Sequence, residues 1–147
     1  MERIGIPKNF GVIAPNLYRS ALPNQSQIFY LAKHHGINTV IDLTERDRNV
    51  VTKTCLKAKI NYVKIPMIDT EINVLAVNQV LKEVQNIDYS VLIHCWAGKH
   101  RTGLISALIQ KQMNFSNQKI FKDLFDFGFG DPNKHSSYFD FLLEQIC

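Results

Sequence analysis

The chain has 147 residues, of which 46% are hydrophobic and 20% charged, and its formal net charge is +4. This size and balance predict a single globular domain, residues 1–147, and exclude a disordered chain. No apolar stretch approaches the ~20 residues of a membrane span, and three widely spaced cysteines exclude a disulfide framework. We therefore expect a cytoplasmic protein without a signal peptide, and a monomer. Its basic residues are spread along the sequence, so no nucleic-acid partner is expected.

Hydrophobic spacing and turn residues predict strands that alternate with helices. In chain order the expected elements are strands over 11–13 and 16–19, a helix over 26–36, a strand over 37–43, a helix over 50–60, a strand over 62–65, a helix over 73–84, a strand over 91–94, and helices over 104–109, 116–125 and 138–146. Ser26 and Ser116 are the residue type that precedes helices, and Gly36 is the type that ends them. The alternation predicts an α/β fold with a central, mostly parallel sheet flanked by helices.

Ligands bind such sheets where a strand's carboxyl end meets the next helix. One such junction, His94–Gly103, reads H-C-W-A-G-K-H-R-T-G and fits the pattern H-C-x-x-G-x-x-R-[ST]-G. The five residues between Cys95 and Arg101 can wrap into a cradle of inward-pointing N–H groups. The following helix adds a positive N-terminal end that favours a phosphate or the Cys95 thiolate. Gly98 permits the tight turn, and Arg101 can hold two phosphate oxygens at once.

These residues resemble the signature of the cysteine-based protein-tyrosine-phosphatase superfamily. Further segments resemble the compact dual-specificity phosphatases, and especially their atypical plant and fungal branch: Asn9-Phe10, Leu17-Tyr18-Arg19-Ser20, Pro23 and Gly98–Gly103. Trp96-Ala97 departs from that branch, because a more basic pair is expected there. The resemblance spans nearly the whole chain and implies a phosphotyrosine-phosphatase-like fold.

The resemblance also implies a two-step reaction in which Cys95 forms a phosphocysteine that water then hydrolyses. Thr102 is similar to the hydroxyl residue that assists departure of the thiolate. The implied substrate-binding residues form the loop itself: Trp96, Ala97, Gly98, Lys99, His100 and Arg101. No metal or cofactor is expected, because the loop supplies the positive charge.

The leaving oxygen needs a proton, which relatives take from an aspartate on a loop before the signature. Asp69 is the first candidate for this general acid and Glu71 the second, while Asp42 and Asp47 are outside candidates. Alternatively, Asp69 or Thr70 simply caps the next helix.

Other readings of single residues stay open. In one alternative, Cys95 is a buried cysteine at the end of a strand and Arg101 is a surface residue, and neither has a catalytic role. In another, His94, Cys95 and His100 hold zinc. Arg19 can order the floor of the site, bind phosphate, or form an ion pair under the sheet. Lys99 and His100 either add positive charge at the rim of the pocket or are solvated loop residues. Trp96 either stacks on an aromatic substrate or only lines the pocket.

The sequence therefore predicts a phosphomonoester hydrolase, first of all a protein tyrosine or dual-specificity phosphatase. The expected partners are a phosphorylated protein or, as an alternative, an inositol phosphate or phosphoinositide. A further alternative is a pseudophosphatase that binds phosphate without turnover. An RNA 5′-phosphatase is disfavoured, because no basic track with stacking aromatic residues is visible.

Overall fold

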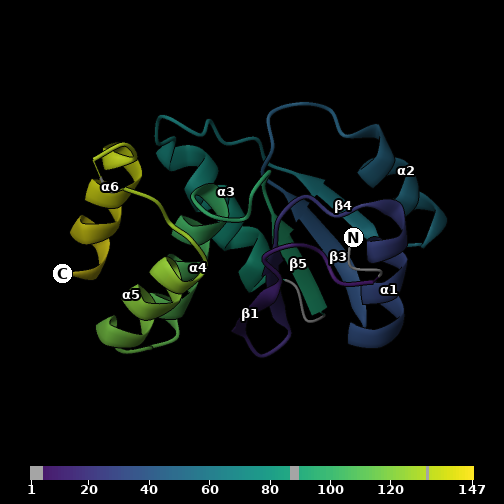
Figure 1. The fold of residues 1–147 in the computed structure, drawn as a ribbon, viewed down its shortest axis with the longest axis horizontal. Coiled ribbons are helices and arrows are strands. Elements are labelled where there is room, and N and C mark those ends of the chain that lie inside the picture. The colour runs from purple at the N-terminus through teal and green to yellow at the C-terminus, as the bar shows by residue number, and fades with distance from the viewer. Residues whose placement is uncertain (1–4, 87–89, 132) are drawn as a thin grey trace.

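The computed structural model describes residues 5–86, 90–131 and 133–147, and it shows a central sheet with helices on both faces (Figure 1). Its elements are β1 (Gly11–Ala14), β2 (Leu17–Ser20), α1 (Gln25–His35), β3 (Ile37–Asp42), α2 (Asn49–Lys57), β4 (Asn61–Lys64), α3 (Val74–Gln85), β5 (Ser90–His94), α4 (Arg101–Gln112), α5 (Asn117–Asp126) and α6 (Ser136–Ile146). Every predicted element is present, with its ends shifted by a few residues at most.

The sheet has the strand order β1-β2-β5-β3-β4. β1 pairs antiparallel with β2, and all the other pairs are parallel, which confirms the mostly parallel sheet. The register places the last residues of four strands in one row: Ser20, His94, Asp42 and Lys64. Because β5 is the central strand, the loop after His94 leaves the middle of this edge.

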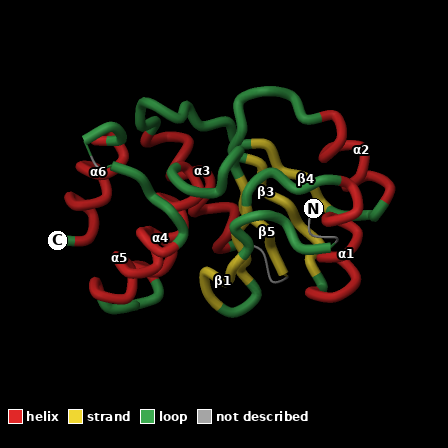
Figure 2. Tube along the Cα trace, in the orientation of Figure 1, coloured by secondary structure: helices red, strands yellow, loops and turns green. Residues whose placement is uncertain are grey.

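Two apolar clusters fix the layers. α1 and α2 cover one face through Ile28, Leu31 and Val51, while α3 to α6 cover the other (Figure 2). α4 lies centrally in the second layer, because α3, α5 and α6 all pack against it. Its residues from Arg101 to Gln110 are all buried, so this helix is covered on every side and has no solvent-facing stripe over that stretch.

Helix starts follow from side-chain caps. α1 begins at Gln25, one residue before the predicted Ser26, because Asn24 is the cap and forms a reciprocal capping box with Gln27. Ser116 caps α5 as predicted, and its side chain accepts from the Lys119 N–H. Within the described part of the chain, no helix combines the length and apolarity needed to cross a bilayer.

Candidate active site

The signature loop joins β5 to α4 and folds around the Cys95 thiol. The Cys95 side chain is buried, and its Sγ accepts the Gly98 N–H at 3.2 Å. Among the described residues, the N–H groups of Trp96, Ala97, Lys99 and His100 find no protein acceptor. An unpaired N–H is costly when it is shielded from water, so this loop is suited to an oxyanion ligand.

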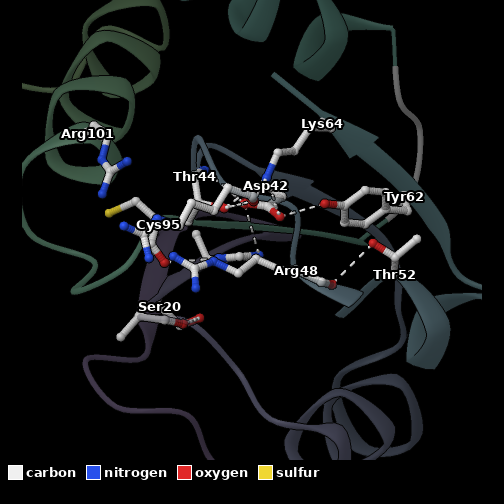
Figure 3. Close-up of polar contacts among 12 residues, drawn as sticks. Ser20, Asp42, Thr44, Arg48, Thr52, Tyr62, Lys64, Cys95 and Arg101 are labelled. Carbon is white, nitrogen blue, oxygen red and sulfur yellow. Dashed lines mark hydrogen bonds and ion pairs between the residues drawn. The ribbon is translucent and has the colours of Figure 1, made fainter. Parts of the chain in front are cut away.

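Arg101 opens α4 and faces the thiol. Figure 3 shows its guanidinium and the Cys95 sulfur pointing toward each other. The Arg101 Nη1 donates to the Met67 carbonyl at 3.2 Å, and Nε lies 3.7 Å from a carboxylate oxygen of Asp69. The side chain is only 10% exposed, so Arg101 is a buried residue and not the surface arginine of the alternative reading.

The hydroxyl of Thr102, the next residue of α4, is fully buried. Its Oγ1 has no hydrogen-bond partner among the described residues. A buried hydroxyl usually finds a partner, so this one is available to a group that arrives or forms during a reaction.

Of the four candidate acids, only Asp69 pairs with Arg101 in the described structure. Its side chain is 48% exposed, so it reaches both the pocket and solvent. Asp69 is not a helix cap, because Asn73 caps α3 with its own side chain. Glu71 and Asp47 are exposed, whereas Asp42 is fully buried beneath the loop and cannot reach a leaving group.

Gly98 sits where the loop touches the neighbouring strand end. Its φ is +72°, and a Cβ there would lie 2.7 Å from the Ala21 nitrogen and the Ser20 carbonyl carbon. Its carbonyl accepts from Arg19 Nη2 at 2.7 Å and from Asn9 Nδ2 at 3.1 Å. The turn is therefore held from two separate segments, and no side chain fits at this position.

Arg19 orders the floor of the site, as one of the sequence readings expected. Its guanidinium lies 4.2 Å from the centre of the Phe127 ring. Burial lowers the pKa of Arg19 to about 10, although the nearby charges of Cys95 and Asp123 partly offset the effect. It forms no ion pair with a described residue, and its hydrogen bond to the Gly98 carbonyl is the contact that ties it to the loop.

Replacing Gly98 by alanine is expected to cost about 2–5 kcal/mol of stability, because left-handed strain adds to a clash with backbone atoms. The catalytic rate is expected to fall as well, since the loop must move. Urea unfolding and steady-state kinetics measure both effects. Gly36→Ala is the matched control, because Gly36 also has a positive φ but its Cβ would meet only one atom, at 3.9 Å. Equal costs at the two positions would contradict the packing argument.

A buried polar network supports the loop from below (Figure 3). Asp42 accepts from the Thr44 N–H at 2.8 Å and from the Tyr62 hydroxyl at 2.5 Å, and Lys64 lies 3.3 Å away. Burial alone would raise the pKa of Asp42, but attraction to His94 and these hydrogen bonds outweigh it, so the pKa is lowered. The carboxylate is therefore ionised at neutral pH.

His94 links this network to the backbone of Cys95. Its Nδ1 lies 3.0 Å from the Cys95 carbonyl, which can only accept, so Nδ1 carries the proton. Complete burial lowers the pKa of His94, and attraction to Asp42, 3.8 Å from Nε2, offsets only part of this effect. The contact with the Cys95 carbonyl fixes the position of the loop's first peptide.

Asp42→Asn is expected to destabilise the fold by about 2–3 kcal/mol at pH 7, because charge-assisted hydrogen bonds are lost. The pKa of Asp42 is lower in the folded state than its unfolded value of about 3.9. Its contribution is therefore present above that value and is lost as the pH falls through the folded pKa. Urea unfolding at pH 7 and in the acid range should show the gap between wild type and variant closing. The exposed Asp140→Asn is the control, and a gap that stays constant would contradict this account.

Asp69, His100 and His135 lie together at the rim, with potential ligand atoms within 4.8 Å of one another. The His100 and His135 rings stack at 3.5 Å and an 18° interplanar angle, and His100 Nε2 accepts the Gly130 N–H at 3.0 Å. Burial, followed by the charge of His135, lowers the pKa of His100, so this ring is neutral. In-plane lone pairs of stacked rings run parallel, so they do not converge on one ion.

The zinc reading of His94, Cys95 and His100 is also wrong, because these three residues do not form a ligand group among the described residues. His100 is half-buried against Gly130 and is not a solvated loop residue. Lys99 is exposed, and its aliphatic stem runs along Gly128.

Trp96 lines a groove of about 1030 Å³ beside the cradle. The groove lies between the 6–10 arm, the 21–24 loop and the start of α2, and contains neither Cys95 nor Arg101. Trp96 is 57% exposed, and the Arg48 guanidinium lies 4.7 Å from its ring centre.

The comparisons with known proteins agree with this geometry. The sequence matches the family model described as the tyrosine phosphatase family over residues 5–142. It is 28% identical to the inositol diphosphatase SIW14 of Saccharomyces cerevisiae over 132 residues, covering 84% of this chain and 46% of SIW14. It is 29% identical to the dual specificity protein phosphatase TpbA of Pseudomonas aeruginosa, covering 82% of this chain and 55% of TpbA. A probable tyrosine-protein phosphatase of Dictyostelium discoideum, DG1060, is 30% identical, covering 80% and 74%.

Solved structures show the same fold. The SIW14 catalytic domain in complex with citrate has a TM-score of 0.82 at 25% identity, covering 92% of this chain and 86% of that one. TpbA in complex with phosphotyrosine has a TM-score of 0.75 at 25% identity, covering 91% and 82%. The chain therefore belongs to the tyrosine phosphatase family and has its fold. It spans about half the length of SIW14 and TpbA.

Proposed function

We propose that this protein hydrolyses phosphomonoesters through a phosphocysteine intermediate. In the first step, the Cys95 thiolate attacks phosphorus while the bond to the leaving oxygen breaks. The free N–H groups of the loop and the Arg101 guanidinium hold the three remaining oxygens as charge shifts onto them. Asp69 gives its proton to the leaving oxygen, so the products are an alcohol or phenol and a phosphorylated Cys95.

In the second step, water attacks the phosphocysteine. The Asp69 carboxylate takes a proton from that water, the sulfur–phosphorus bond breaks, and the electron pair returns to Cys95. In this proposal the Thr102 hydroxyl, which is buried and has no partner among the described residues, donates to the departing sulfur. Inorganic phosphate leaves and the thiolate is regenerated. One observation carries the proposal: a buried thiol inside a loop of unpaired N–H groups, facing an arginine that pairs with an exposed aspartate.

The favoured substrate is a phosphorylated protein side chain. The second and third residues of the cradle, Trp96 and Ala97, carry no charge, and Trp96 presents an exposed ring toward the groove. The Trp96 ring borders a groove lined by both apolar and polar side chains, and such a groove suits a phosphorylated residue together with its flanking peptide. TpbA, a dual specificity phosphatase, is a relative with this fold.

An inositol phosphate is the second candidate. Lys99 is exposed at the cradle, and Arg48 and Lys8 add charge along the groove, so a substrate with several phosphates would find cations on both sides. SIW14 is named as an inositol diphosphatase. Against this candidate, Arg48 is already stacked on Trp96.

Phosphate release from a panel tests the proposal. The panel holds p-nitrophenyl phosphate, phosphotyrosine and phosphothreonine peptides, phosphoinositides and inositol polyphosphates. If the phosphopeptides give the highest kcat/KM of the panel, the result supports a protein phosphatase. If the inositol polyphosphates do, the result supports an inositol phosphate phosphatase. If the folded protein binds vanadate yet turns over nothing, the phosphatase proposal fails and the pseudophosphatase reading replaces it.

Asp69→Asn is expected to slow phenyl phosphate hydrolysis by about 10²–10³-fold, because a poor leaving group needs the proton. The loss on p-nitrophenyl phosphate is expected to be much smaller, since that leaving group departs as an anion. Glu71→Gln is the matched control and should change neither rate. If Glu71→Gln gives the larger loss, the acid is Glu71.

We propose a cytoplasmic site of action, because a reducing compartment keeps an unpaired thiol reduced. A monomer remains our expectation.

A further inference from the structure

The loop that carries Asp69 touches a helix far away in the sequence. The Tyr138 hydroxyl donates to the carbonyl of Ile68, the residue directly before Asp69. The Ser137 Oγ accepts the N–H of Ile72 at 3.0 Å. Both side chains belong to the first turn of α6, so one short stretch of helix holds this loop on both sides of its carboxylate.

One of the two side chains that make these contacts, Tyr138, belongs to the core. Tyr138 is 1% exposed and packs in the main apolar cluster. Burial raises the pKa of Tyr138, so its hydroxyl stays protonated as a donor. α6 itself packs on α4, the helix that begins with Arg101. The helix that carries the phosphate-facing arginine and the loop that carries the acid are thus joined through α6.

The side chain of Asp69 is itself weakly held. Among the described residues it pairs with Arg101 at 3.7 Å, which is longer than a hydrogen bond, and it is half-exposed. The Met67 carbonyl, two residues earlier, is held by Arg101, so the contacts from α6 fix the stretch between Met67 and α3. Loop residues tethered only at their ends sample many positions. A misplacement of about 1 Å in a reacting group can cost 10²-fold in rate.

Resting on the proposed function, we propose that Tyr138 and Ser137 are positioning residues that hold the general acid Asp69 in place over the leaving oxygen. Neither touches the reacting atoms. They act through the backbone of Ile68 and Ile72, which sets the height and direction of the Asp69 side chain.

The test compares Tyr138→Phe, Ser137→Ala and the double variant on phenyl phosphate and p-nitrophenyl phosphate. The double variant is expected to lose about 10–100-fold in kcat on phenyl phosphate but only a fewfold on p-nitrophenyl phosphate. The same changes in an Asp69→Asn background are expected to have no further effect, because the acid through which they act is gone. Tyr30→Phe and Ser136→Ala are the matched controls and should leave both rates unchanged.

Equal losses on the two esters, or a further loss in the Asp69→Asn background, would overturn the proposal and show a merely structural role. Hydrogen exchange of the Ile72 amide gives a readout without turnover, and it should be faster in Ser137→Ala than in wild type. If wild type hydrolyses neither ester, the proposed function fails, whereas the exchange result still decides whether α6 holds the loop. Unchanged exchange in Ser137→Ala would overturn the contact itself.

Discussion

Cys95→Ser is expected to reduce turnover of every phosphomonoester by at least about 10⁴-fold, because a serine hydroxyl at neutral pH is a far weaker nucleophile than a thiolate. The fold should not change, since the two side chains are nearly the same size. The Gly98 N–H retains an acceptor, which preserves the loop. Steady-state kinetics and urea unfolding of the same preparation check both statements.

The variant should also keep its affinity for phosphate analogues, because the cradle of free N–H groups and Arg101 is intact. Cys147→Ser is the control, since Cys147 is exposed at the far end of α6. Residual turnover above about one hundredth of wild type would contradict a nucleophilic role for Cys95.

Arg101→Lys is expected to reduce kcat/KM by about 10³-fold, because an ammonium cannot hold two phosphate oxygens in a fixed plane. The Arg101 side chain bridges the cradle to the acid loop through the Met67 carbonyl and Asp69. The substitution therefore has two effects: it weakens phosphate binding, and it loosens the loop that carries Asp69. Both kcat and KM should worsen, which progress curves over a range of substrate concentrations will show.

Arg46→Lys is the matched control, because Arg46 is exposed and its side chain makes no ion pair with a described residue. If kcat/KM falls only slightly in Arg101→Lys, by as much as in Arg46→Lys, the site needs only a positive charge at residue 101. The planar guanidinium that can hold two phosphate oxygens would then not be required.

The centre of the site could be predicted from the sequence because it is local. Cys95, Gly98 and Arg101 belong to one strand–turn–helix junction, so their spacing alone sets the loop and its chemistry. The strand order places His94 beside Asp42 and Ser20, which follows from the mostly parallel sheet and from β5 being central.

The supports of the site could not be predicted in this way, because they depend on contacts between distant segments. Asn9 reaches the Gly98 carbonyl across 89 residues, and Tyr138 reaches Ile68 across 70. No local pattern marks a tyrosine on an amphipathic helix as a partner of an acid loop. The sequence already favoured Asp69 over Asp42, and the fold adds the difference in burial that separates them, because Asp42 is fully buried and Asp69 is half-exposed.

The proposed reaction passes through a covalent phosphoenzyme on Cys95. The direct measurement is mass spectrometry of the wild-type protein quenched in acid during turnover of p-nitrophenyl phosphate. We predict a species heavier than the free protein by one phosphoryl group, mapped to the peptide that contains Cys95 and absent from Cys95→Ser. Turnover without that species, or with the phosphoryl group on another residue, would contradict the mechanism.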